Sequence, residues 1–273
     1  MYSKHDLYVK VKRLLAYYLS KYSKGVPSGL LSFDRSKMKT HLEREIAYIN
    51  LHLDRYVEIL SRIETQHFPK ELKVLDIGTA SGHLAFLVKS LFNYEVSAID
   101  LKRDETPYWR YRLTNEGITY KICDLTKDTI PFEDECFDLI LFCEVLEHIT
   151  THPMKVFRKI WRVHRKGGIL IMSTPNLLRL PARIRFLFGK NPLSVKHVKG
   201  KAAEHFRLYS ADEIESLIQN SGFQVEKLYF YTPSIYSKKY LKRALHMIAY
   251  LIVKIHSSLG TYIICQAKKP HPS

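Results

Sequence analysis

Val74-Leu-Asp-Ile-Gly-Thr-Ala-Ser-Gly82 is the stretch of this sequence that decides its fold. A short apolar run of β type ends in an acidic residue, and a turn with two glycines leads into a helix-like segment from His83 to Phe92. This order is typical of a strand, a tight loop and a helix, in which backbone N–H groups can approach a ligand closely. The stretch therefore predicts an α/β unit with a ligand-binding loop.

The glycine spacing distinguishes two kinds of loop. A dinucleotide fingerprint needs G-x-G-x-x-G, but here Gly78, Ala80 and Gly82 occupy alternate positions and His83 stands where a further glycine would be needed. This spacing disfavours a nicotinamide enzyme. The loop instead resembles the D-x-G-x-G-x-G loop of class I S-adenosylmethionine (SAM) methyltransferases, which begins here at Asp76 and has Ala80 in place of the middle glycine.

From Lys73 onward, β-type runs alternate with helix-like segments. Several runs are apolar throughout, which is typical of strands covered on both faces. The predicted strands are Lys73–Ile77, Glu95–Asp100, Ile118–Cys123, Phe137–Phe142, Ile169–Thr174, Phe223–Tyr231 and Thr261–Ala267. The predicted helices are His83–Phe92, His152–Val163 and Ala211–Ser221, the last preceded by a capping-box pattern of Ser210 and Glu213. The alternation predicts one open, mostly parallel α/β sheet.

Residues 1–70 show no strand pattern and are predicted to be helical. Gly25, Pro27 and Gly29 divide the segment into two pieces. An apolar stripe at helical spacing is formed by Ile46, Ile49, Leu53, Tyr56, Val57 and Leu60. We therefore predict an N-terminal helical cap or lid over residues 1–70 and the α/β domain over residues 71–273.

Acidic residues follow the predicted strands at the points where the strands end. Asp76, Asp100, Asp124 and Glu144 stand at or directly after the first four. Ligands of open α/β sheets bind beyond the carboxyl ends of the strands. Four consecutive strands that deliver an acid to one edge predict a binding site there.

The resemblance extends over about residues 70–270. It is to the class I SAM-dependent methyltransferases of type 11, the group that includes the ubiquinone-biosynthesis O-methyltransferases. Beyond the loop, Asp100 and Asp124, it is carried by Pro131-Phe-Glu-Asp-Glu-Cys-Phe-Asp138, Leu139-Ile-Leu-Phe-Cys-Glu-Val-Leu-Glu-His148, Arg165-Lys-Gly-Gly-Ile-Leu-Ile171 and Ser173-Thr-Pro-Asn176. It implies a Rossmann-like, seven-stranded, mostly parallel sheet with helices on both faces.

The same resemblance implies roles for individual residues in binding SAM. The methionine end would be held by Asp76, Gly78, Ala80 and Gly82, the ribose by Asp100, the adenine by Asp124 and Leu125, and the amino group by the backbone of Cys143. Two features depart from the family. Ala80 adds a methyl group where the family prefers glycine, and residues 101–107 lack the family's usual serine-led helix.

The candidate catalytic group is Glu144-x-x-Glu147-His148, together with the distant His205. If the chain turns helical after the fourth strand, Glu144 and His148 share one face. Two carboxylates and two imidazoles suit a divalent cation such as Mg²⁺ that holds an acceptor hydroxyl as alkoxide. The set resembles the site of plant small-RNA 2′-O-methyltransferases. Two alternatives remain: a metal-free general base, His148 or His205, and a purely structural cap that contacts the cofactor.

The charge of the chain is strongly asymmetric. The net charge is +16, with +6 in residues 1–70, −7 in residues 71–150 and +17 in residues 151–273. Residues 151–203 contain 13 Lys or Arg and no Asp or Glu. A basic surface kept for solubility is one explanation. The other is an anionic partner, such as a membrane leaflet, a phosphorylated substrate or a nucleic acid.

Two basic amphipathic insertions, near residues 177–201 and 236–258, mix apolar side chains with Lys and Arg. Such helices can lie in a membrane interface, or they can pack their apolar faces on the protein. No apolar run approaches the length of a spanning helix, and no signal peptide is evident. The four cysteines form no C-x-x-C pair, which is typical of a reducing compartment. We predict a cytoplasmic protein that attaches peripherally to the inner face of the membrane.

These observations predict a SAM-dependent O-methyltransferase that acts on an amphipathic or anionic small molecule. The acceptor would be a lipid, a quinone-like ring or a lipid-linked glycan. RNA 2′-O-methylation is the alternative that the basic charge supports, but no RNP-type aromatic pattern accompanies it, so nucleic acid is the less favoured partner. A methyltransferase-like binding protein without activity is the non-enzyme alternative, supported by Ala80 and the irregular residues 101–107.

Overall fold

The computed structural model describes residues 2–23, 35–66, 68–103, 105–191, 205–233 and 251–271. The chain forms two compact units, Met1–Pro131 and Phe132–Ser273. The residue-70 boundary predicted for the helical cap falls inside the first unit. The predicted break at residues 25–29, and residues 192–201 and 236–250 of the insertions, lie outside the described residues.

Three parallel strands form the sheet of the first unit. They are β1 (Lys73–Ile77), β2 (Glu95–Asp100) and β3 (Thr119–Ile122). β2 lies between the others, with Lys73 opposite Glu95 and Asp100 opposite Ile122. Because all three run in the same direction, the chain after Ile77, Asp100 and Ile122 emerges at one edge, as the sequence predicts.

Helices α3 (His83–Phe92) and α4 (Thr106–Asn115) connect these strands. α3 is almost wholly apolar and buried because it packs on the sheet, and it ends at Asn93 in the left-handed conformation. α4 was not predicted from the sequence. Its start is marked by Pro107 in the first turn, a position where the missing N–H of proline costs little.

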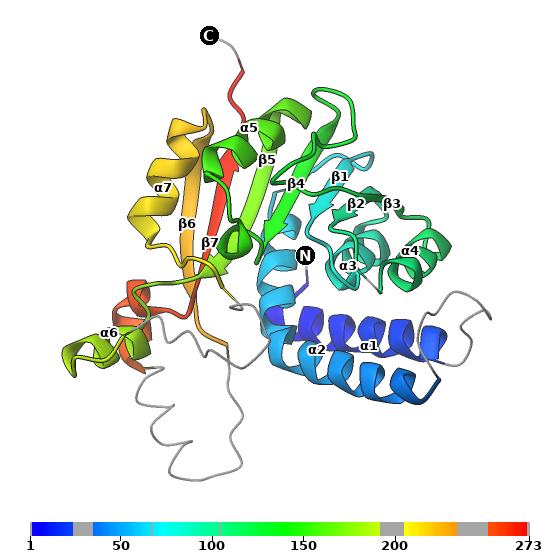
Figure 1. Cartoon of the computed structure of the whole chain (residues 1–273), viewed down its shortest axis with the longest axis horizontal. Coiled ribbons are helices and arrows are strands. Elements are labelled where there is room, and N and C mark those ends of the chain that lie inside the picture. Colours follow the sequence, from blue (N-terminus) through cyan, green and yellow to red (C-terminus); the bar gives the residue numbers. More distant parts are fainter. Residues whose placement is uncertain are drawn as a thin grey trace. The chain divides into compact units, whose positions relative to one another are not determined.

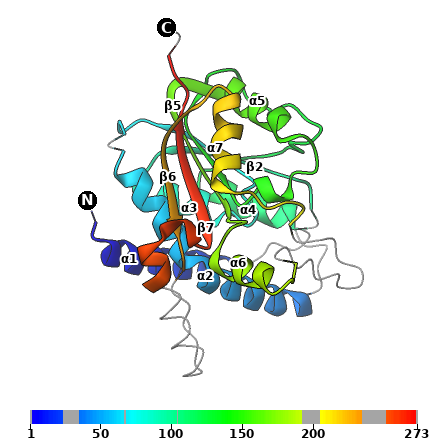
Figure 2. The ribbon, with the colours of Figure 1, turned by 90° about the vertical axis from the view of Figure 1, so that its left-hand side faces the viewer.

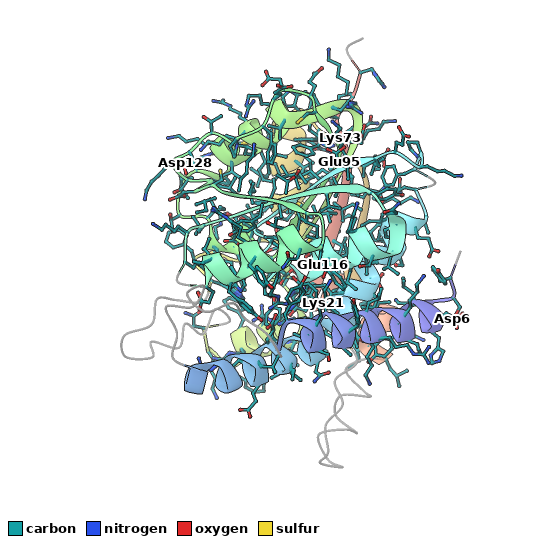
Figure 3. The ribbon with its side chains drawn as sticks, turned by 90° about the vertical axis from the view of Figure 1, so that its right-hand side faces the viewer. Asp6, Lys21, Lys73, Glu95, Glu116 and Asp128 are labelled. Carbon is teal, nitrogen blue, oxygen red and sulfur yellow. The ribbon has the colours of Figure 1, made fainter. Side chains whose placement is uncertain are left out.

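Two long helices, α1 (Lys4–Ser23) and α2 (Arg35–Glu64), precede the sheet and lie side by side (Figure 1). The predicted apolar stripe of α2 is buried from Ile49 to Leu60, but Ile46 is 42% exposed, so the stripe begins one turn later than predicted. Lys21 near the end of α1 pairs with Glu116 after α4 at 2.7 Å (Figure 3). The helical prediction for residues 1–70 is thus confirmed for the described residues.

The second unit contains the other four strands. β4 (Phe137–Cys143) and β5 (His164–Pro175) are parallel, whereas β7 (Tyr262–Lys268) runs antiparallel between β5 and β6 (Gln224–Tyr231). Its helices include α5 (Pro153–Val163), α6 (Leu180–Leu187) and α7 (Ala211–Asn220), with short 3₁₀ turns η1 (Leu146–His148) and η2 (Ser257–Leu259). The capping box of Ser210 and Glu213 at the start of α7 is present in full.

The seven strands follow the order β3-β2-β1-β4-β5-β7-β6. The prediction of a seven-stranded, mostly parallel α/β sheet with a helical N-terminal region is therefore confirmed. Within the described part of the chain, no helix combines the length and the hydrophobicity that crossing a bilayer requires.

Candidate functional site

The loop after β1 has the backbone of a tight ligand loop. Gly78, Ala80 and Gly82 all lie in the left-handed region, with φ of 74°, 48° and 80°. The N–H groups of Gly78 and Thr79 donate to the carbonyl of Ile99, which ties the loop to β2. Ala80 therefore takes the conformation that glycine takes most easily, and its side chain is accommodated with local strain.

Asp76 anchors the inner side of this loop. Its side chain is buried, and its Oδ2 accepts a hydrogen bond from the Thr79 hydroxyl at 2.6 Å. Burial raises the pKa of Asp76 to about 7, and the hydrogen bond from Thr79 opposes that rise, while the negative charge of Asp100 adds to it. A cationic ligand group beside Asp76 would favour its charged form.

Asp100, for which the resemblance implies binding of the ribose, ends β2. It is 5% exposed, and its two oxygens accept hydrogen bonds from the backbone N–H groups of Ala80 and Leu101. Burial raises the pKa of Asp100, opposed by these hydrogen bonds and by Arg103. A carboxylate offers about four acceptor sites, so acceptor capacity remains for two vicinal hydroxyls of a nucleoside.

The residues assigned to adenine lie just beyond β3. Asp124 Oδ1 accepts hydrogen bonds from the backbone N–H and the hydroxyl of Thr126, and Asp124 Oδ2 lies 3.3 Å from Lys127 Nζ. These contacts lower the pKa of Asp124, the Thr126 hydroxyl first. Leu125 is buried. Asp124 thus favours its ionised form and holds its own turn. It lies at the same sheet edge of the first unit as Asp76 and Asp100.

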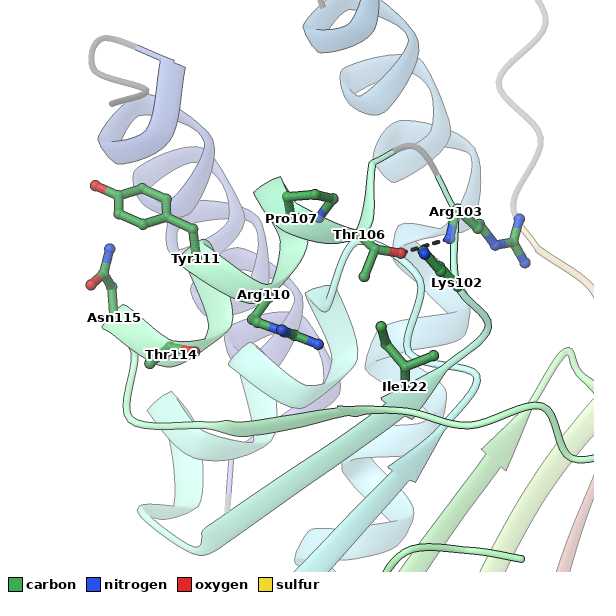
Figure 4. A pocket seen from close by; sticks show the side chains of 9 residues that line it. All are labelled: Lys102, Arg103, Thr106, Pro107, Arg110, Tyr111, Thr114, Asn115 and Ile122. Carbon is green, nitrogen blue, oxygen red and sulfur yellow. Dashed lines mark hydrogen bonds between the residues drawn. The ribbon is translucent and has the colours of Figure 1, made fainter. Parts of the chain in front are cut away.

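A cavity of about 680 Å³ opens beside α4 (Figure 4). Its described lining residues are Lys102, Arg103, Thr106, Pro107, Arg110, Tyr111, Thr114, Asn115 and Ile122. Three of these are cations and none is acidic. Arg103 Nε also lies 3.7 Å from Asp100 Oδ1, so a cavity suited to an anionic group adjoins the acid at the end of β2.

In the second unit, Cys143 and Glu144 stand where β4 ends. The thiol of Cys143 contacts the carbonyl oxygen of Ile171 at 3.9 Å. Glu144 is a non-glycine residue in the left-handed region, with φ of 57°, and its Oε1 accepts a hydrogen bond from the Ser173 hydroxyl at 2.8 Å. Such backbone strain clusters at functional sites, where surrounding contacts maintain it.

The second unit contains a cluster of possible metal ligands: Glu147, His148 and His205. One ligand atom from each lies within 4.8 Å of the others, and the two imidazole rings pack edge to face at 5.2 Å. Glu147 is fully buried and its Oε2 accepts from the Thr174 hydroxyl at 3.1 Å. The backbone N–H of Phe206 donates to the carbonyl of Glu147 at 2.7 Å, which brings His205 beside His148 although 57 positions separate them in the sequence.

The expectation that Glu144 and His148 share a helix face is wrong. The chain forms only the single 3₁₀ turn η1, which begins at Leu146, and the left-handed Glu144 lies outside it. Glu144 is accordingly not a member of the three-residue cluster found among the described residues. Its carboxylate is directed to Ser173 instead.

Some residues of these clusters were missed by sequence reasoning. Ser173 and Thr174 were noted only as part of a motif, yet their hydroxyls hold Glu144 and Glu147. Their position at the end of β5, opposite the end of β4, could have indicated this. His83 was treated only as a spacing position, but it is 2% exposed and hydrogen-bonded to Glu45 of α2, a contact that no local pattern reveals.

Residues 75–172 match the model of a methyltransferase domain. Residues 75–172 therefore form a methyltransferase domain. It is 25% identical over 175 residues to the mitochondrial ubiquinone biosynthesis O-methyltransferase of Rattus norvegicus, covering 61% of this chain and 50% of that protein. It is 23% identical over 170 residues to a ubiquinone/menaquinone biosynthesis C-methyltransferase of Xylella fastidiosa, covering 56% and 66%.

The methyltransferase fold also has solved counterparts. The phosphoethanolamine N-methyltransferase 2 of Haemonchus contortus, in complex with SAM, matches with a TM-score of 0.55 and 18% identity, covering 80% of this chain and 53% of that one. This likeness establishes the fold. The chain spans about half the length of the first curated relatives that it matches.

Proposed function

We propose that this protein transfers the methyl group of SAM to an oxygen of an amphipathic, anionic small molecule that it meets at a membrane surface. The lipid, quinone-like or lipid-linked glycan acceptors predicted from the sequence all fit this description. The observation that carries the proposal is α6, an exposed apolar and cationic helix directly after β5. The relatives with ubiquinone in their names support a lipid-like acceptor.

The chemistry demanded of the protein is modest because the sulfonium of SAM already activates the methyl group. The loop of residues 76–82 and Asp100 would bind and orient the cofactor. Alignment of donor and acceptor is the protein's main contribution, within the about 7–11 kcal/mol available from proximity and orientation. Asp124 and Leu125 would complete the cofactor contacts of the first unit.

α6 exposes its apolar side chains to solvent. Phe186, Leu187 and Phe188 are 72%, 82% and 76% exposed, and only Ala182 of the helix is buried. Arg183 and Arg185 are exposed on the same helix. Adjacent large apolar groups beside cations favour insertion at an anionic lipid surface. In Figures 1 and 2, α6 lies beyond the carboxyl end of β5, the edge at which Thr174 contacts Glu147.

The second insertion supports the same proposal in its described part. Residues 251–255 are helical, and Leu251 and Ile255 are 53% and 77% exposed. The exposed apolar side chains of α6 and of residues 251–255 favour this proposal over the alternative that both apolar faces pack on the protein. Peripheral attachment to the inner face of the membrane follows as part of the proposal.

The methyl-transfer assay tests the acceptor class. Methyl-labelled SAM is incubated with the protein and a cell extract, and the extract is separated into organic-soluble, nucleic-acid and protein pools. Label in the organic-soluble pool is expected. Label in the nucleic-acid pool would replace the proposal with RNA 2′-O-methylation, and binding should then weaken steeply with salt.

A double substitution of α6, Phe186→Ser with Leu187→Ser, is expected to reduce binding to phosphatidylcholine–phosphatidylserine vesicles at least about tenfold. Full burial of each side chain contributes about 1.5–3 kcal/mol. Sedimentation with vesicles measures the effect. Leu51→Ser is the matched control, because Leu51 is 65% exposed on α2 of the first unit. Equal binding of the double variant and wild type would reject membrane contact through α6.

We further propose that Glu147, His148 and His205 hold a divalent cation. Two imidazoles and a carboxylate with ligand atoms within 4.8 Å of one another fit such an ion. When bound, the cation would lower the pKa of an acceptor hydroxyl. Glu144, which was predicted as a fourth ligand, would instead hold the end of β5 through Ser173.

His205→Ala is expected to reduce methyl transfer at least about 100-fold and to remove its dependence on added Mg²⁺, because a cation loses one of its imidazole ligands. Activity is measured after treatment with a chelator and again after Mg²⁺ is restored. His256→Ala is the control, since His256 is exposed and outside the cluster. Loss of activity in His205→Ala without any cation requirement in wild type would favour a metal-free general base.

A further inference from the structure

Ser81 lies between two residues with left-handed backbone in the loop that is proposed to bind SAM. Its neighbours on both sides, Ala80 and Gly82, lie in the left-handed region with φ of 48° and 80°. Conformations of this kind persist only where surrounding structure holds them. The contacts made by Ser81 therefore bear directly on the shape that the loop offers to SAM.

Both N-terminal helices act on Ser81, α1 directly and α2 through His83. From α1, the hydroxyl of Tyr18 donates to the Ser81 carbonyl at 3.4 Å. The Tyr18 ring is fully buried and stacks on Phe86 of α3 at 4.2 Å, which orients the hydroxyl. The Ser81 hydroxyl lies 3.2 Å from His83 Nδ1.

α2 acts on the same residue through His83. The Nε2 atom of His83 lies 2.7 Å from Glu45 Oε1. A carboxylate only accepts hydrogen bonds, so Nε2 carries the hydrogen and Nδ1 of the neutral ring is left as an acceptor. Burial lowers the pKa of His83, against the opposing effect of Glu45, which keeps the ring neutral. Nδ1 can then accept from the hydroxyl of Ser81 or from that of Tyr56, at 3.3 Å.

Arg112 of α4 holds the Glu45 carboxylate in place. Its Nη1 donates to both oxygens of Glu45, at 2.8 and 3.1 Å. The guanidinium also lies 4.2 Å from the centre of the Tyr18 ring. The Tyr18–Ser81 hydrogen bond and the Glu45–His83 hydrogen bond thus share one buried support.

We propose that Tyr18, and Glu45 acting through His83, are positioning residues that hold Ser81 and thereby set the affinity of the loop for SAM. The N-terminal helices would contribute to cofactor binding through these two hydrogen bonds. This inference rests on the proposed cofactor role of the loop. It does not depend on the identity of the acceptor.

Tyr18→Phe and Ser81→Ala test it, because each removes a hydroxyl and leaves the packing intact. Each is expected to raise the Kd for SAM about threefold to tenfold, in keeping with the loss of one hydrogen bond. Ser81→Thr, which keeps the hydroxyl, is expected to restore the Kd. Calorimetric titration with SAM and a thermal melt of each variant provide the measurements.

Tyr22→Phe is the matched control. Tyr22 is also a buried tyrosine of α1, but its hydroxyl contacts the Arg112 carbonyl and Glu116, not the loop. The inference is overturned if Tyr18→Phe and Ser81→Ala bind SAM as wild type does, or if Tyr22→Phe weakens binding equally. A wild-type chain that fails to bind SAM would overturn it together with the cofactor assignment. If no lipid-like acceptor were found, the comparison of the Kd values for SAM would still test the inference.

Discussion

Gly82→Ala is expected to lower the free energy of unfolding by about 2–5 kcal/mol and to abolish measurable SAM binding. Two costs combine at this position. The backbone has φ of 80°, where an L side chain costs about 1–2 kcal/mol. A Cβ atom would also lie 2.4 Å from Leu113 Cδ2 of α4, and relief of such overpacking costs about 1–3 kcal/mol.

Leu113 has no room to retreat because it is fully buried. The movement must therefore come from the loop, which would displace the backbone between Asp76 and His83. Urea denaturation measures the loss of stability, and calorimetric titration measures SAM binding.

Gly117→Ala is the matched control for the steric part of this effect. Gly117 has φ of 70°, yet a Cβ atom there would meet nothing within 4 Å. The Gly117→Ala variant should lose only about 1–2 kcal/mol of its free energy of unfolding and keep its affinity for SAM. If Gly82→Ala were no more destabilising than Gly117→Ala, the contact with Leu113 would not contribute to the loss of stability.

Arg112→Met is expected to lower the free energy of unfolding by about 3–5 kcal/mol, the usual cost of breaking a buried ion pair from one side. Arg112 is fully buried and donates to both oxygens of Glu45, which is 7% exposed. Without Arg112, the hydrogen bond from His83 is the only one that the described residues still donate to the Glu45 carboxylate. Urea denaturation at neutral pH is the measurement.

Two further variants separate charge from packing. Arg110→Met removes an exposed arginine from the same helix and should change stability little. Adding Glu45→Gln to Arg112→Met removes the uncompensated charge and should recover part of the loss. A double variant as unstable as the sum of the single variants would contradict the ion pair as the cause.

The pH dependence of stability gives an independent readout of the same pair. Burial raises the pKa of Glu45, but the hydrogen bond from His83 and the charge of Arg112 outweigh burial and lower the pKa to about 2 from 4.5. A carboxyl with a lowered folded-state pKa stabilises the protein above about pH 4.5 and loses that contribution as the pH falls through about 2. In Arg112→Met this loss should begin at a higher pH.

The local elements of the fold follow from sequence patterns alone. The bounds of β1, β2 and α3 agree with prediction because each is a short apolar run with clear turn residues at its ends. α4 escaped prediction because its helix begins with Thr106 and Pro107 instead of a capping serine, and because its buried face is made by polar and aromatic side chains such as Arg112 and Trp109.

The placement of the proposed cofactor residues in the first unit was also readable from the sequence. Asp76, Asp100 and Asp124 stand at the ends of strands, and parallel pairing brings strand ends to one edge without any further information. The acid–imidazole cluster of the second unit was predicted less well. Glu147, His148 and His205 do come together, but a helix face was expected to include Glu144, and the left-handed backbone at Glu144 prevents it.

The sequence by itself determined the alternation of strands and helices, the loop with its alternate small residues and the acids at the strand ends. These depend on contacts between residues close in the chain and on the direction of parallel strands. Tertiary structure alone decided that His205 meets His148, and that Glu45 meets His83 and Arg112. These pairs lie 38 to 67 positions apart, and their meeting depends on the packing of whole helices and loops, which no periodicity within one segment encodes.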